Sequence, residues 1–343
     1  MPASSEVGSV SAPFPRLLGD IGGTNARWGW QAGPGAPIGA IDVRPVSAHA
    51  SLLDAARDYL ARHGHPPPRA AAIGVATPVT GDAVRMTNHP WAFSIRALKA
   101  SLGVDRLRVL NDFEALALAL PALAPSALRP LGHGADARAA DDAPRALLGA
   151  GTGLGVSALV RCGSRWQPIA GEGGHVTLAA ADDDEAAVLA LLRRTHGHVS
   201  AERVCSGSGL VVLYRAACEL AGHPPHLLEP AEVGRLALGG GDADCVRAAG
   251  WFAGFLGNVA GNLALTLGAR GGVHVGGGVV PRLGAAFDAA RFRARFEAKG
   301  RFAAYLRAIP TWLVVAPTPA LTGAALALDS EDTPRRAEGD PLD

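Results

Sequence analysis

The 343-residue chain has little charge and few aromatic side chains. Charged residues make up 18% of it, aromatic residues 5%, and the formal net charge is +1. With no basic surplus, the composition argues against nucleic-acid partners and against a polybasic membrane patch. Cysteines are also scarce and form no CxxC pair or Cys/His cluster, which predicts reduced thiols, a cytoplasmic location and no structural zinc. They are Cys162, Cys205, Cys218 and Cys245.

What the chain does contain is apolar residues (48%), 44 glycines and 25 prolines, typical of a globular protein rich in tight turns. Residues 248–269 carry no charge over a length that could span a membrane. Asn258, Asn262 and five glycines in this stretch favour instead a buried helix that packs closely through its glycines. We therefore expect no membrane segment.

Strand-like and helix-like segments alternate along the chain and predict an α/β protein of two lobes. The stretch 121–145, rich in Ala, Pro and Asp, is the expected boundary. We expect a small lobe of 15–121 plus about 313–328, a large lobe of 122–312, a disordered leader (1–14) and a frayed tail (329–343). Ser47 and Ser94 are the expected caps of two helices in the small lobe. Helices are expected at 48–63, about 94–103, 111–120, 183–195, 206–221, 229–238, 243–268 and 320–328, with strands at 16–20, 26–31, 70–76, 83–87, 105–110, 271–278 and 313–317 and a strand–turn–strand unit at 146–160.

Residues 16–30 and 146–160 match each other at an offset of 130. The matched pairs are Leu17 with Leu147, Leu18 with Leu148, Gly19 with Gly149 and Gly23 with Gly153. Such matches can arise by chance, because glycine turns are common. The alternative is two lobes of related build, each offering one phosphate-binding hairpin.

Each of these segments holds a glycine-rich turn, Gly22-Gly23 in the first and Gly151-Thr152-Gly153 in the second. Glycines at a strand end expose backbone N–H groups to a phosphate with no Cβ in the way. The chain has no Walker P-loop, and Val156 breaks the dinucleotide fingerprint. By spacing alone, a plain tight hairpin is as good an interpretation as a phosphate site.

Two side chains favour the phosphate interpretation for the first turn. An acid such as Asp20 beside a phosphate would repel it unless a cation lay between them, which indicates Mg²⁺ held by Asp20 through water. The Thr24 hydroxyl can donate to a phosphate oxygen, and Thr152 can do the same from the second turn.

A further acid, Asp112, follows Asn111 where an apolar strand meets a helix. Ligands of α/β sheets gather at the carboxyl ends of strands, so Asp112 could accept the proton of an attacking hydroxyl. Either residue could instead simply cap the helix.

Polar residues on later loops suit a polyhydroxyl ligand. Glu172 and His175 lie on the turn GEGGH, which could be a binding loop or plain surface. Glu202 lies in the first turn of a helix that Ser200 caps, which is also ordinary capping. Together with Asn111 and Asp112, these groups offer the donors and acceptors that recognise adjacent sugar hydroxyls.

These motifs, taken in order, resemble the bacterial glucokinase family, over about residues 15–328. The matching segments are GDIGGTNARW (19–28), MTNHPWAFS (86–94), NDFEALALA (111–119), GAGTGLGV (149–156), GEGGHV (171–176), HVSAERVCSGSGL (198–210) and NLALTLGARGGVHVGGGVVPR (262–282). The resemblance implies a two-lobed actin-like ATPase (ribonuclease H-like) fold with an inter-lobe cleft. It also implies ATP, Mg²⁺ and glucose as ligands and a homodimer.

The resemblance also implies a role for each motif. Asp112 matches the catalytic base for the sugar 6-hydroxyl. The sugar-binding residues are Asn111, Glu172, His175 and Glu202; the first phosphate motif is Asp20, Gly22, Gly23 and Thr24; the second is Gly151, Thr152 and Gly153; the adenosine motif is Gly276, Gly277 and Gly278.

Two other functions fit the same residues. One is a kinase of this fold that acts on another hexose or uses ADP or polyphosphate as donor. The other is a non-catalytic sugar sensor, although a sensor need not keep a base at position 112. The hexose range and any allosteric control stay open.

Overall fold

A computed structural model describes residues 13–132, 134 and 137–329, so most of the expected leader and tail lies outside the described residues. The chain divides into two compact units. The first runs to Pro121 and resumes at Thr318, and the second is Ala122–Pro317. We expected residues 313–317 in the first unit, and this was wrong, because the strand β13 (Thr311–Val314) belongs to the sheet of the second. The inter-lobe cleft stays a prediction.

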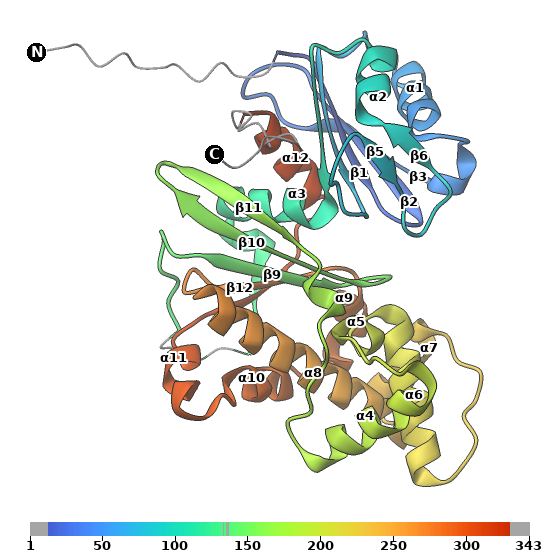
Figure 1. The fold of residues 1–343 in the computed structure, drawn as a ribbon, viewed down its shortest axis with the longest axis vertical. Coiled ribbons are helices and arrows are strands. Elements are labelled where there is room, and N and C mark those ends of the chain that lie inside the picture. Colours follow the sequence, from blue (N-terminus) through green and yellow to red (C-terminus); the bar gives the residue numbers. More distant parts are fainter. Residues whose placement is uncertain (1–12, 133, 135–136, 330–343) are drawn as a thin grey trace, which may run out of the picture. The chain divides into compact units, whose positions relative to one another are not determined.

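The first unit contains a mixed five-stranded sheet with strand order β3-β2-β1-β4-β7. Its first three strands form an antiparallel meander, and β4 and β7 then run parallel to β1. Figure 1 shows α1 and α2 over one face of this sheet and α3 and α12 over the other. The elements are β1 (Arg16–Ile21), β2 (Asn25–Gln31), β3 (Gly39–Pro45), α1 (Leu52–Arg62), β4 (Ala70–Val75), β5 (Ala83–Arg85), β6 (Ala92–Ser94), α2 (Ile95–Leu102), β7 (Arg106–Asn111), α3 (Asp112–Ala119) and α12 (Pro319–Asp329).

Both faces of this sheet are covered, which explains why β4 is apolar throughout and β1 is apolar over Leu17–Gly19. Successive side chains of a strand point to opposite faces. Accordingly Leu17 joins the core with α1 and α2, whereas Leu18 packs with Leu321 and Leu328 of α12. The strand β4 (AAAIGV), an inner strand between β1 and β7, is fully buried.

Helix α1 begins later than the sequence indicated. Ser51 is its N-cap and accepts from the Asp54 N–H at 3.1 Å, whereas the expected cap Ser47 lies in a preceding 3-10 turn. The expected cap at Ser94 is confirmed, since it accepts from the Ala97 N–H and α2 ends at Gly103 in the left-handed region.

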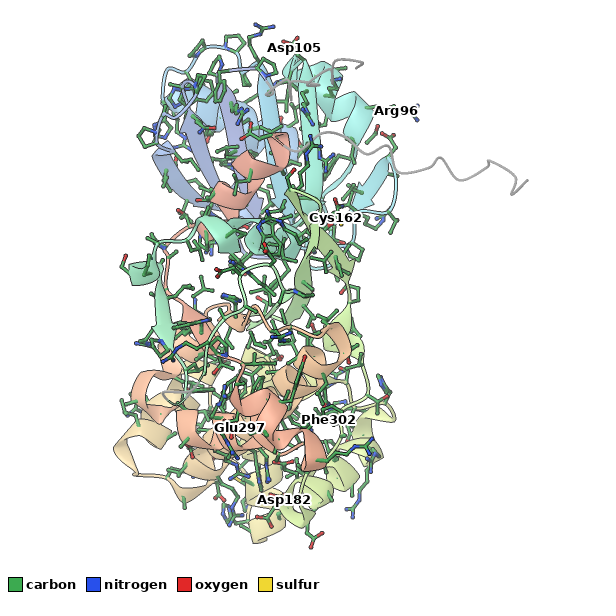
Figure 2. All side chains as sticks on the ribbon, turned by 90° about the vertical axis from the view of Figure 1, so that its left-hand side faces the viewer. Arg96, Asp105, Cys162, Asp182, Glu297 and Phe302 are labelled. Atoms are coloured by element: carbon green, nitrogen blue, oxygen red, sulfur yellow. The ribbon has the colours of Figure 1, made fainter. Side chains whose placement is uncertain are left out.

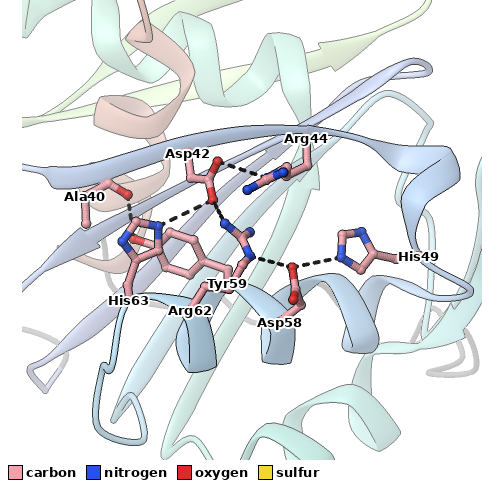
Figure 3. A network of polar contacts seen from close by, with 8 residues as sticks. All are labelled: Ala40, Asp42, Arg44, His49, Asp58, Tyr59, Arg62 and His63. Carbon is pink, nitrogen blue, oxygen red and sulfur yellow. Dashed lines mark hydrogen bonds and ion pairs between the residues drawn. The ribbon is translucent and has the colours of Figure 1, made fainter.

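A polar network clasps α1 to the edge strand β3 (Figure 3). Arg62 binds both Asp42 on β3 and Asp58 on its own helix. His49 completes the network with a contact of 3.0 Å to Asp58, and the Tyr59 hydroxyl donates to the Ala40 carbonyl at 2.9 Å. These contacts fix an otherwise exposed edge strand to the unit.

The second unit contains a six-stranded sheet with strand order β11-β10-β9-β12-β13-β8. Its first five strands repeat the order and directions of the first sheet, and β8 adds an antiparallel edge. The interpretation of the offset-130 match as two units of related build is therefore confirmed. Its elements are β8 (Leu128–Pro130), β9 (Arg145–Ala150), β10 (Leu154–Cys162), β11 (Arg165–Gly171), α4 (Asp183–His196), α5 (Ala201–Val204), α6 (Gly207–Ala221), α7 (Pro230–Gly239), α8 (Ala243–Leu267), β12 (Val273–Gly276), α9 (Val279–Leu283), α10 (Ala289–Glu297), α11 (Ala303–Arg307) and β13.

The apolar stretch 248–269 forms most of α8, which lies in the core of the second unit with α6, α7 and α10 around it (Figure 1). Its glycines allow close packing as predicted. A Cβ at Gly257 would overlap the backbone oxygen of Phe292 on α10, and one at Gly261 would lie 2.5 Å from that of Phe296. Within the described part of the chain, no helix is long and apolar enough to cross a membrane.

One buried acid ties α4 to α10. Glu185 is fully buried, and its carboxylate accepts from Arg295 Nε at 3.0 Å and from the Ala181 N–H at 2.7 Å. Arg295 also pairs with Asp182, which is labelled in Figure 2. A buried carboxylate is tolerated only when it is paired and hydrogen-bonded in this way.

Candidate active site

The first unit brings two predicted motifs to one edge of its sheet. The strands β1, β4 and β7 are parallel neighbours, so their carboxyl ends meet at that edge. Asp20 pairs in register with Gly74, and Val75 with Asn111, which places the first glycine turn and the start of α3 two strands apart. A Cβ at Gly74 would lie 3.5 Å from the Asp112 Cα, so the glycine allows α3 to begin close to the sheet.

The first turn itself, residues 22–24, connects β1 to β2. The Gly22 N–H donates to the Asn25 carbonyl at 2.9 Å, and the Thr24 carbonyl accepts from the Val46 N–H at 2.9 Å. Thr24 is exposed, and a Cβ at Gly23 would lie 3.1 Å from the Asn88 Cβ. The turn is therefore held by its own backbone, and its threonine hydroxyl faces solvent-accessible space.

Asp20 is partly balanced by a residue that the sequence analysis missed. Arg27 lies directly opposite it on β2, with Nη1 3.3 Å from the Asp20 carboxylate. Burial raises the pKa of Asp20, and the charge of Arg27 and its hydrogen bond act against the rise. No short pattern signalled this pair, because the residue that faces position 20 depends on the length of the turn and so on the register of the two strands.

These residues fit a magnesium site. Mg²⁺ binds protein through one or two carboxylates, keeps several waters, and takes its other ligands from substrate phosphates. Asp20 offers one carboxylate in a partly desolvated position, and Arg27 offsets the effect of burial on its pKa only in part. The adjacent turn offers backbone and hydroxyl donors for phosphate.

At the start of α3 the capping interpretation is confirmed for Asn111. Its side-chain oxygen accepts from the Phe113 N–H at 2.8 Å, while Glu114 accepts from the Asn111 N–H at 3.0 Å, a complete capping box. Asp112 is half-buried in the first turn of the helix, and its carboxylate accepts from the Phe113 N–H at 3.0 Å. The helix N-terminus is a favourable place for this acid.

The second unit brings together the other predicted groups. The turn between β9 and β10 closes through the Gly151 N–H, which donates to the Gly153 carbonyl at 2.8 Å. Glu202, at the start of α5, accepts from the Leu154 N–H at 2.8 Å, and a Cβ at Gly153 would overlap its carboxylate. The glycine is thus required for Glu202 to reach the second turn.

Glu202 also lies next to the loop that carries Glu172 and His175. His175 Nδ1 is 4.0 Å from Glu202 Oε1, and its Nε2 is 3.9 Å from Glu172 Oε2. The loop packs on β10, because a Cβ at Gly174 would overlap the Leu154 carbonyl. The three side chains are 34–60% exposed, which leaves their polar atoms accessible to a ligand.

The predicted adenosine motif lies beside the second turn. Gly276 ends β12 and pairs in register with Gly149 on β9. Gly277 has φ +79°, and a Cβ there would overlap the Ala150 carbonyl, so only glycine fits. Gly278 follows as the residue before α9.

The sequence analysis also missed the amino end of α6 at this turn. The Gly207 N–H donates to the Gly151 carbonyl at 2.9 Å, and Ser206 caps the helix by accepting from the Gly209 N–H at 3.0 Å. A helix N-terminus beside a glycine turn favours anion binding. The segment SGSG (206–209) carried this signal as a capping serine followed by glycines.

Comparison with known proteins shows the family of this chain. The sequence profile of the family described as Glucokinase matches residues 17–331. The chain is 52% identical to a glucokinase of Aromatoleum aromaticum over 93% of its own length and 96% of the relative's. It is 50% identical to one of Chromobacterium violaceum, with coverages of 94% and 91%. A crystal structure of glucokinase from an Antarctic psychrotroph superposes with a TM-score of 0.82 at 36% identity, covering 92% of this chain and 99% of that one.

The fold defines the protein class: an α/β protein built of two related units, each with a mixed sheet. The sugar kinases among its structural neighbours have the same architecture. Within that class, the chain belongs to the glucokinase family.

Proposed function

We propose that this protein transfers the γ-phosphoryl group of ATP to the 6-hydroxyl of D-glucose, with Asp112 as general base. Membership of the glucokinase family supports the reaction. The observation that carries the assignment of the base is the position of Asp112. It is a half-buried acid at the carboxyl end of β7, on the same sheet edge as the glycine turn after β1.

Phosphoryl transfer requires little covalent chemistry from a protein beyond positioning, charge stabilisation and removal of one proton. In the proposed step the sugar O6 forms a bond to the γ-phosphorus while the bond from phosphorus to the ADP oxygen breaks. Asp112 takes the proton from O6 as the oxygen attacks. A carboxylate offers about four lone-pair sites, so Asp112 can accept from the Phe113 N–H and also take this proton.

For the sugar, we propose that Asn111, Glu172, His175 and Glu202 bind the remaining hydroxyls. The accessible carboxylates of Glu172 and Glu202 suit bidentate acceptance from adjacent hydroxyls, and the intervening His175 can donate or accept. The Asn111 amide nitrogen lies 3.4 Å from the carbonyls of both Val75 and Thr77, long contacts that a ligand oxygen can replace.

For the nucleotide, we propose that two turns bind phosphate and that Gly276–Gly278 lies against adenosine. When bound, Mg²⁺ would supply positive charge to the phosphates, and Asp20 would hold it through water. The repeated strand order of the two sheets supports assigning the fold to the actin-like, ribonuclease H-like ATPases. A homodimer and a cytoplasmic location stay predictions.

The test is a coupled assay of the purified chain with glucose, mannose and fructose, each with ATP, ADP and polyphosphate. We expect ATP with glucose to give the largest kcat/KM. A preference for another hexose or donor would replace the substrate assignment. Glucose binding in calorimetry without any phosphorylation would instead support a sugar sensor.

A further inference from the structure

At the carboxyl end of α6, the opposite end from the second turn, the second unit gathers three side chains of the kinds that bind transition metals. Cys218, His223 and Asp244 each offer one donor atom, and these atoms all lie within 4.8 Å of one another. His223 Nε2 is 2.9 Å from Asp244 Oδ2, and Cys218 Sγ is 3.9 Å from the same oxygen. These residues are separated by 5 and 21 positions and match no metal motif, so the sequence alone indicated no Cys/His cluster.

Regular backbone structure holds each of the three residues in place. Helix α6 ends at Gly222 in the left-handed region (φ +82°), and the His223 N–H then donates to the Cys218 carbonyl at 3.1 Å. This turn folds the histidine back beside the last turn of the helix that carries the cysteine. Asp242 caps α8 by accepting from the Asp244 and Cys245 N–H groups at 2.9 and 2.8 Å.

The packing of α6 against α8 then brings the two helix ends together. Cys218 is fully buried, the Asp244 side chain is 13% exposed and the His223 side chain is 50% exposed. The cluster is therefore closed on the thiol side and open to solvent on the imidazole side, which provides a path for a small ion.

We infer that Cys218, His223 and Asp244 form a binding site for a divalent transition-metal ion of the Zn²⁺ class, with solvent as the fourth ligand. Thiolate, imidazole and carboxylate are the three protein ligands of zinc, at roughly 2.0–2.3 Å in tetrahedral geometry. Tetrahedral ligands at those lengths are about 3.3–3.8 Å apart. The observed separations of 2.9 and 3.9 Å lie on either side of that range, so small side-chain shifts suffice.

The donor set also decides between classes of cation. Mg²⁺ and Ca²⁺ prefer oxygen ligands, whereas a thiolate with an imidazole selects zinc and its neighbours. The site is thus chemically distinct from the magnesium site proposed at Asp20. A bound ion would join the end of α6 to the start of α8 and so stabilise the helical part of the second unit.

The simplest alternative is an ion pair between His223 and Asp244, with Cys218 as an uninvolved buried thiol. Burial raises the pKa of Cys218, and Asp244 and Asp242 add to the rise against a hydrogen bond with Tyr214. The thiol without metal is therefore neutral, and metal uptake releases its proton. Only a direct measurement of sulfur ligation separates the two cases.

The experiment uses the full chain in a Cys162→Ser background, because Cys162 is an exposed thiol that could bind metal adventitiously. Co²⁺ titration is followed by the near-ultraviolet thiolate-to-cobalt charge-transfer band. We expect the band to saturate at one ion per chain and to disappear when Zn²⁺ is added. Calorimetric titration with Zn²⁺ should give the same stoichiometry.

Three variants assign the ligands. Cys218→Ser should abolish the band, and His223→Gln should weaken the affinity by at least the roughly 10–100-fold that loss of a supporting residue causes. His226→Gln is the matched control, since this exposed histidine lies three residues away in the same loop and outside the cluster. It should bind like the parent chain.

His223→Gln keeps the inference testable even if the buried Cys218→Ser fails to fold, because His223 is half exposed. A folded parent chain that shows no band with excess Co²⁺ would overturn the inference. So would a band that His223→Gln leaves unchanged, or a Zn²⁺ affinity that His226→Gln lowers equally. With Mg²⁺ present and no added Zn²⁺ or Co²⁺, phosphorylation by His223→Gln should equal the parent rate, so the outcome is independent of the proposed function.

Discussion

The two sheets share strand order and direction but differ in what they carry at the end of their first strand. At the offset of 130, Asp20 of β1 corresponds to Ala150 of β9. In the first hairpin four residues, 22–25, separate the last paired residues, and Asp20 faces Arg27 next to them. In the second hairpin three residues, 151–153, separate the last paired residues, and the pairs next to them are uncharged.

The second unit places its carboxylates differently. Glu172 and Glu202 come from the segments after β11 and before α6, and Glu202 reaches the turn by accepting from the Leu154 N–H. The sheet fixes only where each turn lies, so the charge beside the first turn comes from the hairpin itself and the charge beside the second comes from a separate helix. The first turn suits a cation with its phosphate, and the second offers backbone N–H groups and the Thr152 hydroxyl.

The largest expected effect is in the first unit, at Asp112. Replacement by Ala or Asn removes the proposed base, and loss of a general base lowers turnover by about 10²–10⁴-fold. Glucose binding should persist in calorimetry. Asp105→Asn is the control, since this exposed acid precedes the same strand, at its other end (Figure 2). Near-normal turnover of the Asp112 variants would remove the assignment.

The next largest effect is expected from replacing Asp20 by Ala, the residue found at the corresponding position 150 of the second unit. Asp20→Ala or Asp20→Asn should raise the Mg²⁺ and ATP concentrations needed for half-maximal rate by about tenfold or more, the size of a charged hydrogen bond. Because burial raises the pKa of Asp20 above 3.8, its contribution to stability falls as the pH rises through the folded-state value. Neither variant should therefore melt much earlier at neutral pH, and an unchanged Mg²⁺ requirement would count against the metal role.

In the second unit, substitutions of Glu172 and Glu202 should differ in their effects on the KM values for glucose and ATP. Glu172→Gln should raise the KM for glucose by about tenfold, the loss of one hydrogen bond to a charged group, with the KM for ATP unchanged. Glu202→Gln should raise both, because Glu202 also accepts from the backbone of the second turn. Equal effects of the two variants on both constants would argue against this distinction.

Stability tests compare the glycine contacts of the second unit. Gly257→Ala should destabilise by about 1–3 kcal/mol, because the new methyl group overlaps the Phe292 carbonyl. Gly250→Ala is the matched control on the same helix, where the nearest atom is the flexible Arg291 guanidinium at 3.4 Å. It should be neutral or stabilising by up to about 1 kcal/mol, from helix propensity. Thermal unfolding of both variants measures the difference.

The smallest effect is expected at the clasp between α1 and β3 in the first unit. Burial acts to raise the pKa of Asp42, but hydrogen bonds from Arg62 and His63 outweigh it and lower that pKa. Hydrogen bonds from Arg62 and His49 likewise lower the pKa of Asp58 against a smaller effect of burial. Depressed pKa values stabilise the fold above pH about 3.8, and the gain is lost as the pH falls through the folded-state values. Arg62→Gln should therefore cost no more than about 1 kcal/mol at neutral pH and less at acid pH, measured by urea unfolding.

Much of the architecture was predictable because its signals are local. The apolar runs predicted β1, β4 and β7, and the caps Ser94 and Ser206 mark helices close to where they were expected. The edge strands β3 and β11 were missed, because they are largely exposed and lack an apolar alternation strong enough to indicate a strand. The cap of α1 was misplaced because Ser47 and Ser51 are equally good N-cap residues, and packing chose the second.

By itself, the sequence determined the chemistry on offer: two glycine turns, an acid near the end of the first strand, an acid at the start of α3 and the family to which the chain belongs. These depend on residue type and short spacing, which are local properties. Only the tertiary structure decided which of them meet, since Arg27 facing Asp20, Glu202 reaching Leu154 and Cys218 meeting Asp244 depend on sheet register and helix packing. Contacts across many residues arise from the packing of whole elements, and no short pattern encodes that packing.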